Sequence, residues 1–200
     1  MRKKNQMKEQ RNLNILLFAS VGYYIKGVDT AIKGIRMARD EYGLRINLII
    51  ALKSEQKDIL RQIADECDGT IPDWIIPVSV RQDVASLYHL ADVYLCASRS
   101  EGFCYSIVES VYCGCQVIQS DIPQTPRDIP GTYVFKCADP VSLKYSIIKL
   151  AEDMKSDSYT DLQKAQRDYV IATYNIQKWT SSCYNILSMV YENRYNREAI

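Results

Sequence analysis

The sequence of 200 residues has a single histidine, His89, and no apolar run of the kind that spans a membrane. A catalytic histidine needs a positioned partner, and none is evident beside His89, so a surface or packed position is the better interpretation. No run reaches the roughly 18 consecutive apolar residues of a membrane span, and the amino terminus has no hydrophobic signal region. These absences predict a soluble, cytoplasmic chain. Peripheral contact with the inner face of a membrane, through a part that this chain lacks, stays open.

An excess of charge of either sign is also missing. The chain has 25 Lys and Arg against 24 Asp and Glu, a formal net charge of +1, which gives no electrostatic reason to expect a nucleic-acid partner. The seven cysteines are odd in number and several lie in apolar segments, which argues against a disulfide framework and for a reducing compartment. Cys113 and Cys115 lack the spacing of a zinc site, so we expect no metal there.

The common nucleotide fingerprints are absent as well. The sequence has no glycine-x-glycine-x-x-glycine pattern and no phosphate-loop motif, which disfavours a nicotinamide enzyme or an ordinary ATPase. Hydrophobic residues make up 47% of the chain and charged residues 24%, enough for one full-sized globular domain. Residues 1–12 are polar and basic and predict an arm or linker, so we place the domain at residues 13–200.

Apolar periodicity predicts alternating strands and helices over this domain. The expected strands are 13–19, 47–52, 74–80, 92–96, 116–119 and 132–135. The expected helices are 28–42, 55–67, 82–90, one that begins between 104 and 106, then 141–154, 162–174 and 176–195. Alternation of this kind predicts an α/β fold, a parallel sheet with helices on both faces.

The most informative stretch is residues 97–121, where Glu101 and Glu109 bracket a loop and a helix start. A helix start offers free amides and the positive end of the helix dipole to an anion, whereas a carboxylate accepts hydrogen bonds from hydroxyls. At the carboxyl end of a strand, the combination suits a ligand with both phosphates and sugar hydroxyls, such as a nucleotide-sugar. The alternative is structural, because Ser98 with Glu101, and Ser106 with Glu109, each also fit a capping box.

This stretch resembles the signature of the retaining glycosyltransferases of family 4, among the glycosyl transferases group 1. The family pattern has two glutamates separated by seven residues in a serine-glutamate-glycine-phenylalanine context, then a small residue, a glycine and an apolar strand that ends in serine-aspartate. Residues 98–103, Glu109, Cys113-Gly114 and residues 117–121 match it. The resemblance covers roughly residues 13–195, a one-domain length. It implies the Rossmann-like, carboxyl-terminal, donor-binding half of a GT-B fold.

The resemblance also implies roles for single residues. Glu101 would hold the donor's sugar ring and help to stabilise the developing cation, as the catalytic residue, and Glu109 would hold the ribose hydroxyls. Lys26, in a lysine-glycine pair, would contact the diphosphate. The spacing from Pro77 to Tyr88 equals that of the family segment whose backbone holds the nucleotide base, which implies that Val78 and Ser79 lie beside the base. The remaining donor-binding candidates are Gly102, Phe103, Cys104 and Tyr105 at the helix start, and Val78 and Ser79 at the base.

Two departures from the family pattern affect the phosphate site. The usual glycine-arginine pair falls on Ser20 and Val21, so a second phosphate-binding cation is missing from its place. Arg99 is close enough in sequence to compensate and is therefore kept as a donor-binding candidate. The turn at residues 51–54 lacks the usual glycine, so the backbone there approaches a ligand less closely, and we assign it no binding role.

The implied function is metal-independent, cofactor-free sugar transfer in polysaccharide biosynthesis, from a UDP- or GDP-linked donor to a glycan or lipid-linked acceptor. Because a two-domain enzyme needs about twice this length, the partner would be an amino-terminal acceptor domain or a separate subunit. An alternative is a non-catalytic or split-enzyme subunit that docks through its last helix. A GT-B sugar-nucleotide epimerase is a weaker third. The last helix has a broad apolar face, for which packing in the domain's own core is the first interpretation. That face comprises Trp179, Tyr184, Ile186, Leu187, Val190 and Tyr191.

Overall fold

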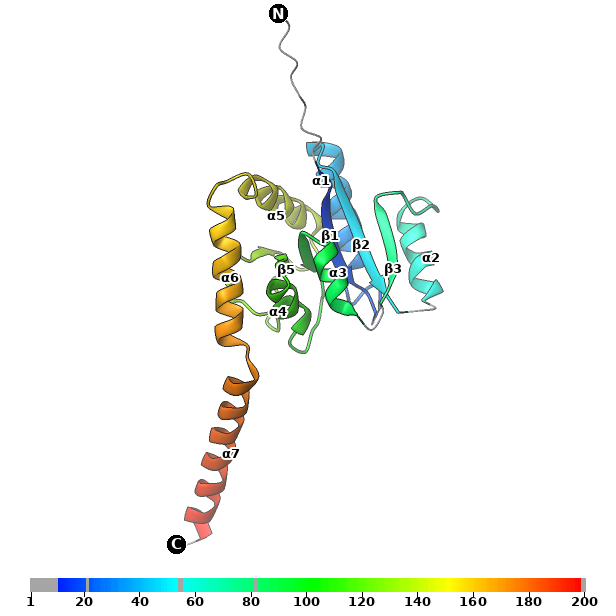
Figure 1. The fold of residues 1–200 in the computed structure, drawn as a ribbon. Helices are drawn as coiled ribbons and strands as arrows, with labels where there is room; N and C mark the ends of the chain where they lie inside the picture. The colour runs from blue at the N-terminus through cyan, green and yellow to red at the C-terminus, as the bar shows by residue number, and fades with distance from the viewer. Residues whose placement is uncertain (1–10, 21, 54–55, 81–82, 199–200) are drawn as a thin grey trace, which may run out of the picture.

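The computed structural model describes residues 11–20, 22–53, 56–80 and 83–198 (Figure 1). Six strands form one sheet in the order β3-β2-β1-β4-β5-β6, and every neighbouring pair is parallel. The strands are β1 (Leu13–Phe18), β2 (Ile46–Leu52), β3 (Ile75–Ser79), β4 (Val93–Cys96), β5 (Gln116–Ser120) and β6 (Tyr133–Phe135). The predicted parallel α/β sheet is confirmed.

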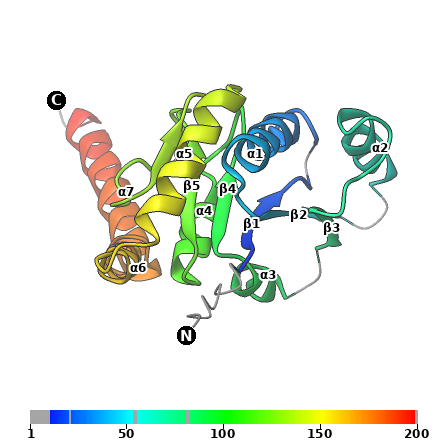
Figure 2. The same ribbon diagram turned by 90° about the horizontal axis from the view of Figure 1, so that it is seen from above.

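Helices cover both faces of the sheet. Successive side chains of a strand point to opposite faces, so a strand that is buried on both sides is a continuous apolar run. In β1, Ile15 and Leu17 pack in a core with α1, α2 and α5, whereas Leu16 packs in a second core with α3, α4 and α6. Figure 2 shows α1, α2 and α5 along one side of the sheet and α3 along the other. The helices are α1 (Val28–Tyr42), α2 (Lys57–Glu66), α3 (Val84–Leu90), α4 (Tyr105–Tyr112), α5 (Pro140–Asp153), α6 (Tyr159–Thr173) and α7 (Ile176–Glu198).

Local sequence signals explain the start of α5 in particular. The side chain of Asp139 accepts hydrogen bonds from the backbone amides of Val141 and Ser142, and Pro140 is the first residue of α5, as expected. Helix α6 begins at Tyr159, three residues earlier than expected. The residues expected to open the second and third helices, 54–55 and 82, lie outside the described residues, and so does most of the expected arm.

The strand order reverses at the centre of the sheet, between β1 and β4, and we call the carboxyl-terminal side of this point the crevice. The chain runs outward from β1 through β2 to β3, then crosses back to β4 beside β1 and continues to β6. The loops that leave the carboxyl ends of β1 and β4 therefore lead to opposite faces, toward α1 and α4. In open parallel sheets, ligands bind where the strand order reverses in this way.

Helix α7 contradicts the expectation that its apolar face packs in the core. Trp179 is 63% exposed and Tyr184 is 70% exposed, and the other members of that face are exposed as well. Figure 1 shows α7 extending away from the sheet and its covering helices. The periodicity of a helix identifies its apolar face but not the surface that covers it, which is why the expectation was wrong. Over the described residues, no helix has the length and apolar character that crossing a bilayer requires.

Candidate functional site

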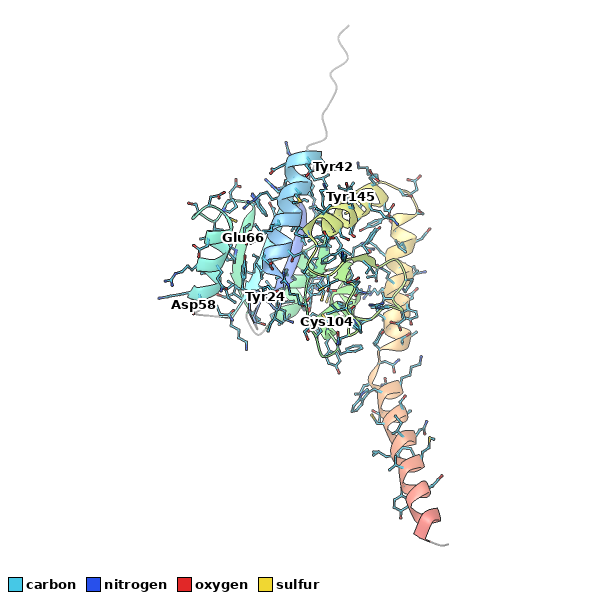
Figure 3. All side chains as sticks on the ribbon, turned by 180° about the vertical axis from the view of Figure 1, so that it is seen from behind. Tyr24, Tyr42, Asp58, Glu66, Cys104 and Tyr145 are labelled. Atoms are coloured by element: carbon cyan, nitrogen blue, oxygen red, sulfur yellow. The ribbon has the colours of Figure 1, made fainter. Side chains whose placement is uncertain are left out.

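The segments that follow β1 and β4 meet at the crevice. The backbone amide of Arg99 donates to the carbonyl of Ile25 at 2.8 Å. Gly27, just before α1, has φ of +64°, and a Cβ atom there would lie 2.0 Å from the carbonyl oxygen of Ala97. Only glycine permits this approach, so it holds the two segments together. Figure 3 shows Tyr24 and Cys104, one from each segment, on the side of the sheet-bearing part opposite to Tyr42 and Tyr145.

Glu101 lies in the segment after β4 and is held by two donors. Lys26 Nζ donates to Glu101 Oε1 at 2.6 Å, and the hydroxyl of Ser98 donates to the same oxygen at 2.5 Å. The side chains of Lys26 and Glu101 are only 17% and 11% exposed. The structure thus brings together two residues that the sequence predicted for one site. An ammonium group has three N–H donors, so the bond to Glu101 leaves two for another acceptor.

Glu109, on the second turn of α4, is exposed and has a different partner. The hydroxyl of Tyr88, on α3, donates to Glu109 Oε2 at 2.8 Å. Burial, and then the hydrogen bond to this carboxylate, raise the pKa of Tyr88 above its ordinary value, so the phenol stays protonated and keeps donating at neutral pH. Sequence reasoning gave Tyr88 no role of its own, although the spacing from Pro77 had drawn attention to it.

The start of α4 has the form expected of an anion site. Among the described residues, Cys104 at the N-cap makes no side-chain cap to the first amides of α4. Gly102 is exposed, and a Cβ atom there would meet no heavy atom within 4 Å, so the space beside it is open. The Phe103 ring is half-buried, 4.9 Å from the Tyr105 ring and 5.9 Å from the Tyr174 ring. Free amides and open space therefore coincide at this helix tip.

The capping-box interpretations of the two glutamates are wrong. Ser98 does bond to Glu101, but no helix begins at that position in the described chain. Ser106 is the second residue of α4 rather than its cap, and Glu109 bonds to Tyr88. Both glutamates are thus held by contacts between separate elements or within the loop, and neither closes a helix start.

Arg99 is bound within the protein. It donates to both carboxylate oxygens of Asp29 at 2.9 and 2.8 Å, and its guanidinium carbon lies 4.0 Å from the centroid of the Tyr24 ring. Burial disfavours charge on Asp29, but hydrogen bonds from Arg99 and from the Thr30 amide outweigh it and hold the pKa of Asp29 below its usual value. The predicted contact of Arg99 with a diphosphate would require these bonds to break.

The predicted base-binding pair lies farther along the same sheet edge. Val78 is half-buried and Ser79 is exposed at the carboxyl end of β3. Three strand spacings, about 14 Å, separate β3 from β4, so the structure does not bring this pair beside Glu101. His89 lies exposed on α3.

Residues 1–169 match the protein-family model described as "Glycosyl transferases group 1". The chain belongs to this family. A search of the curated proteins found no match.

Solved structures similar to this group 1 chain show the same fold at low sequence identity. A glycosyltransferase from Rickettsia africae ESF-5 is 15% identical with a TM-score of 0.78, covering 92% of this chain and 49% of its own. Anabaena Alr3699/HepE, solved in complex with UDP-glucose, is 14% identical with a TM-score of 0.75, covering 90% and 49%. The carboxyl-terminal domain of a group 1 family protein (LpcC) from Francisella tularensis is 19% identical with a TM-score of 0.67, covering 82% and 87%. The chain therefore has a Rossmann-like fold of the GT-B kind and spans about half the length of the first two.

Proposed function

We propose that this chain is the donor-binding half of a retaining, metal-independent glycosyltransferase of family 4. The observation that carries the proposal is the meeting, at the crevice between β1 and β4, of the Lys26–Glu101 pair with the uncapped start of α4. A cation and free amides bind phosphate, and a carboxylate accepts hydrogen bonds from sugar hydroxyls. This one site offers groups of both kinds. The solved complexes of HepE with UDP and with UDP-glucose support a nucleotide-sugar as the ligand class.

In the proposed mechanism, the leaving diphosphate is bound by Lys26 and by the amides of residues 102–105. These donors are already in place before the bond breaks, so they stabilise the developing negative charge without reorganisation. Glu101 accepts hydrogen bonds from the transferred sugar, and its negative charge offsets the positive charge that develops at the anomeric carbon. Lys26 and Ser98 orient that carboxylate.

The nucleoside is held on the other side of the same helix tip. Glu109 accepts hydrogen bonds from the ribose hydroxyls. The hydroxyl of Tyr88 orients the Glu109 carboxylate by donating to its Oε2 atom. The backbone of Val78 and Ser79 binds the base farther along the sheet edge. Donor binding thus extends from β3 to α4, and the base, which is uracil or guanine, is bound at β3.

The acceptor half would be an amino-terminal domain or a separate subunit. The chain spans about half the length of its GT-B neighbours, and we place the acceptor, a glycan or lipid-linked sugar, in that other half. The cytoplasm is the proposed location, with any contact with a membrane made by the acceptor half.

A thermal-shift panel of UDP, GDP and ADP, followed by calorimetry of the nucleotide that stabilises the chain most, tests donor binding. Glu109→Ala is expected to weaken nucleotide binding by about tenfold or more, because a charged hydrogen-bond acceptor contributes about 1.5–3 kcal/mol. Glu152→Ala removes an exposed glutamate of α5 and serves as the matched control. Equal nucleotide affinity in wild type and Glu109→Ala would contradict the assignment.

A second candidate, a split-enzyme or non-catalytic subunit, is favoured by the exposed apolar side chains of α7. A surface of this kind on a protein is typical of an interaction site. Sedimentation over a range of concentrations measures self-association through α7, and Trp179→Ser with Leu187→Ser should reduce it. Sugar transfer by the purified chain alone would exclude this second candidate.

A further inference from the structure

Two thiols face each other beneath the donor-binding loop. Cys96 is the last residue of β4 and is 2% exposed, and Cys104, the residue before α4, is 7% exposed. Their sulfur atoms are 3.4 Å apart. A carboxylate oxygen of Glu101 completes the group, because it and both sulfurs lie within 4.8 Å of one another. In the part of the chain that the structure describes, no other three side chains of metal-ligating type come this close.

Cys104 has a backbone conformation that is uncommon for a residue with a side chain. Its φ of 55° and ψ of 61° lie in the left-handed region, which glycine adopts freely and a residue with a side chain adopts only at a cost. Strained positions of this kind cluster at functional sites. Here the strain holds a thiol against a second thiol and beside a carboxylate, on the loop that carries the proposed catalytic group.

We propose that Cys96, Cys104 and Glu101 form a site for one soft divalent cation of the Zn²⁺ or Cd²⁺ class. Zinc–sulfur bonds of about 2.3 Å in a tetrahedron put two sulfurs about 3.8 Å apart, so the observed pair needs to separate by only about 0.4 Å. A disulfide bond of about 2.05 Å would instead need the sulfurs to approach by about 1.3 Å. The spacing therefore fits a shared metal ion better than a covalent link.

Proton and charge balance are favourable. Binding replaces two thiol protons, which leave to solvent, by two metal–sulfur bonds, and no electron is transferred.

The surroundings of the carboxylate are also those of a metal site. Two thiolates and Glu101 carry three negative charges against two on the ion, and the Lys26 ammonium, 2.6 Å from Glu101 Oε1, balances the remaining one. Ligating carboxylates are commonly fixed by hydrogen bonds of this kind, and Ser98 supplies a second one. A water molecule or a phosphate oxygen would fill the fourth position of the tetrahedron.

A metal ion here would inhibit the enzyme. With its carboxylate bound to the ion, Glu101 could not accept a hydrogen bond from a sugar hydroxyl. The metal and the nucleotide-sugar would therefore compete for Glu101. This consequence rests on the proposed function, whereas the metal site itself does not.

Titration of the fully reduced 200-residue chain with Cd²⁺, followed by the thiolate-to-metal charge-transfer absorbance, tests the site. We expect one tightly bound Cd²⁺ per chain. Cys104→Gly should weaken binding at least a hundredfold without unfolding the chain, since glycine suits φ of 55°. Cys183→Ser on α7 also removes one thiol, as Cys104→Gly does, but it should leave the high-affinity site intact. Glu101→Gln should keep the charge-transfer band but bind at least tenfold more weakly.

Three results would overturn the proposal. They are the absence of a tight site in the reduced wild type, equal Cd²⁺ affinity in wild type and Cys104→Gly, or a thiol count in the unreduced protein that shows Cys96 and Cys104 joined as a disulfide. Calorimetry with UDP-glucose and with GDP-glucose, before and after Cd²⁺ loading, separates the two proposals. Equal nucleotide-sugar binding in both states removes only the inhibition, whereas no binding of either nucleotide-sugar in either state contradicts the proposed function and leaves the metal site standing.

Discussion

The loop after β4 and helix α4 each carry one acid of the candidate site, and they fix it by different means. Glu101 lies on irregular backbone and is held by Lys26, by Ser98 and by the bonds that Arg99 makes to the segment before α1. Glu109 lies on a helix, whose own hydrogen bonds fix its Cα position, and takes one side-chain bond from Tyr88. A loop must be positioned by its contacts, whereas a helix needs them only to orient a side chain.

This difference predicts where the molecule is sensitive to substitution. Changes to the contacts between the two crevice segments should affect both folding and binding, because those contacts define the position of Glu101. Changes around Glu109 should affect binding alone, and by less. Four substitutions, from the largest expected effect to the smallest, test this ordering.

Gly27→Ala should have the largest effect. Its Cβ atom would lie 2.0 Å from the Ala97 carbonyl oxygen at a φ of +64°, so the two segments must separate. We expect a loss of about 3–4 kcal/mol in the free energy of unfolding, from strain and overpacking together. Urea denaturation followed by circular dichroism measures it.

Gly43→Ala is the matched control for Gly27→Ala. Gly43 has the same φ of +64°, but a Cβ atom there meets no heavy atom within 4 Å, so only the backbone cost of about 1 kcal/mol applies. If the two variants lose equal stability, the close approach of the crevice segments is not what makes Gly27 necessary.

Asp29→Asn should have the next largest effect, because it leaves Arg99 without its charged partner. We expect a loss of about 2 kcal/mol at neutral pH. The pKa of Asp29 is lower in the folded protein than its ordinary value, so this stability is present above the ordinary value and is lost as pH falls through the folded one. The difference between wild type and variant should therefore shrink below about pH 4.

The control for Asp29→Asn is Asp58→Asn, which removes an exposed acid from the first turn of α2 (Figure 3). Asp29 also lies in the first turn of its helix, so the two variants lose a similar interaction with the helix dipole. Denaturation at several pH values should show a change of about 0.5 kcal/mol or less for Asp58→Asn. An equally large loss there would mean that the dipole, and not Arg99, accounts for the effect.

The sequence predicted the fold well because each signal was local. Apolar runs with polar limits gave the strands, and Asp139 with Pro140 gave the start of α5. The family resemblance placed Lys26 and Glu101 in one site, although the chain separates them by 75 residues. It did not give the bond between them, because a motif specifies which residues a ligand meets and not how they contact each other before it binds.

The features that sequence reasoning missed depend on contacts between distant segments. Arg99 with Asp29, and Tyr88 with Glu109, join residues that no periodicity relates. The apolar face of α7 was recognised, but its predicted burial was wrong, because amphipathicity does not name a partner. The contact of Ser98 with Glu101 was visible as a serine and a glutamate three residues apart, but the only structural role considered for this pair, as the alternative to ligand binding, was a helix cap.

Ser98→Ala should have the third largest effect. It tests whether Glu101 binds the transferred sugar while Glu109 binds the ribose. It removes one of the two donors to Glu101, so we expect about tenfold weaker binding of the nucleotide-sugar, about 1.4 kcal/mol. Binding of the nucleotide diphosphate alone should change little, because the proposed ligand of Glu101 is the sugar. Calorimetry with both ligands measures the difference. A uniform loss for both would assign Glu101 to the diphosphate instead.

Tyr88→Phe should have the smallest effect, because α4 keeps Glu109 in place when the phenol oxygen is removed. Phe fills nearly the same volume in the core between α3 and α4, so the free energy of unfolding should change by about 1 kcal/mol or less. We expect about threefold weaker binding of both the nucleotide and the nucleotide-sugar in calorimetry, since the ribose is common to them. Tyr133→Phe, whose lost hydroxyl bonds to Asp153 on α5, is the control for a lost hydroxyl away from Glu109 and should leave affinity unchanged. A loss larger than that of Ser98→Ala would mean that a helix residue depends on its side-chain partner as much as a loop residue does, and the distinction between the two acids would fail.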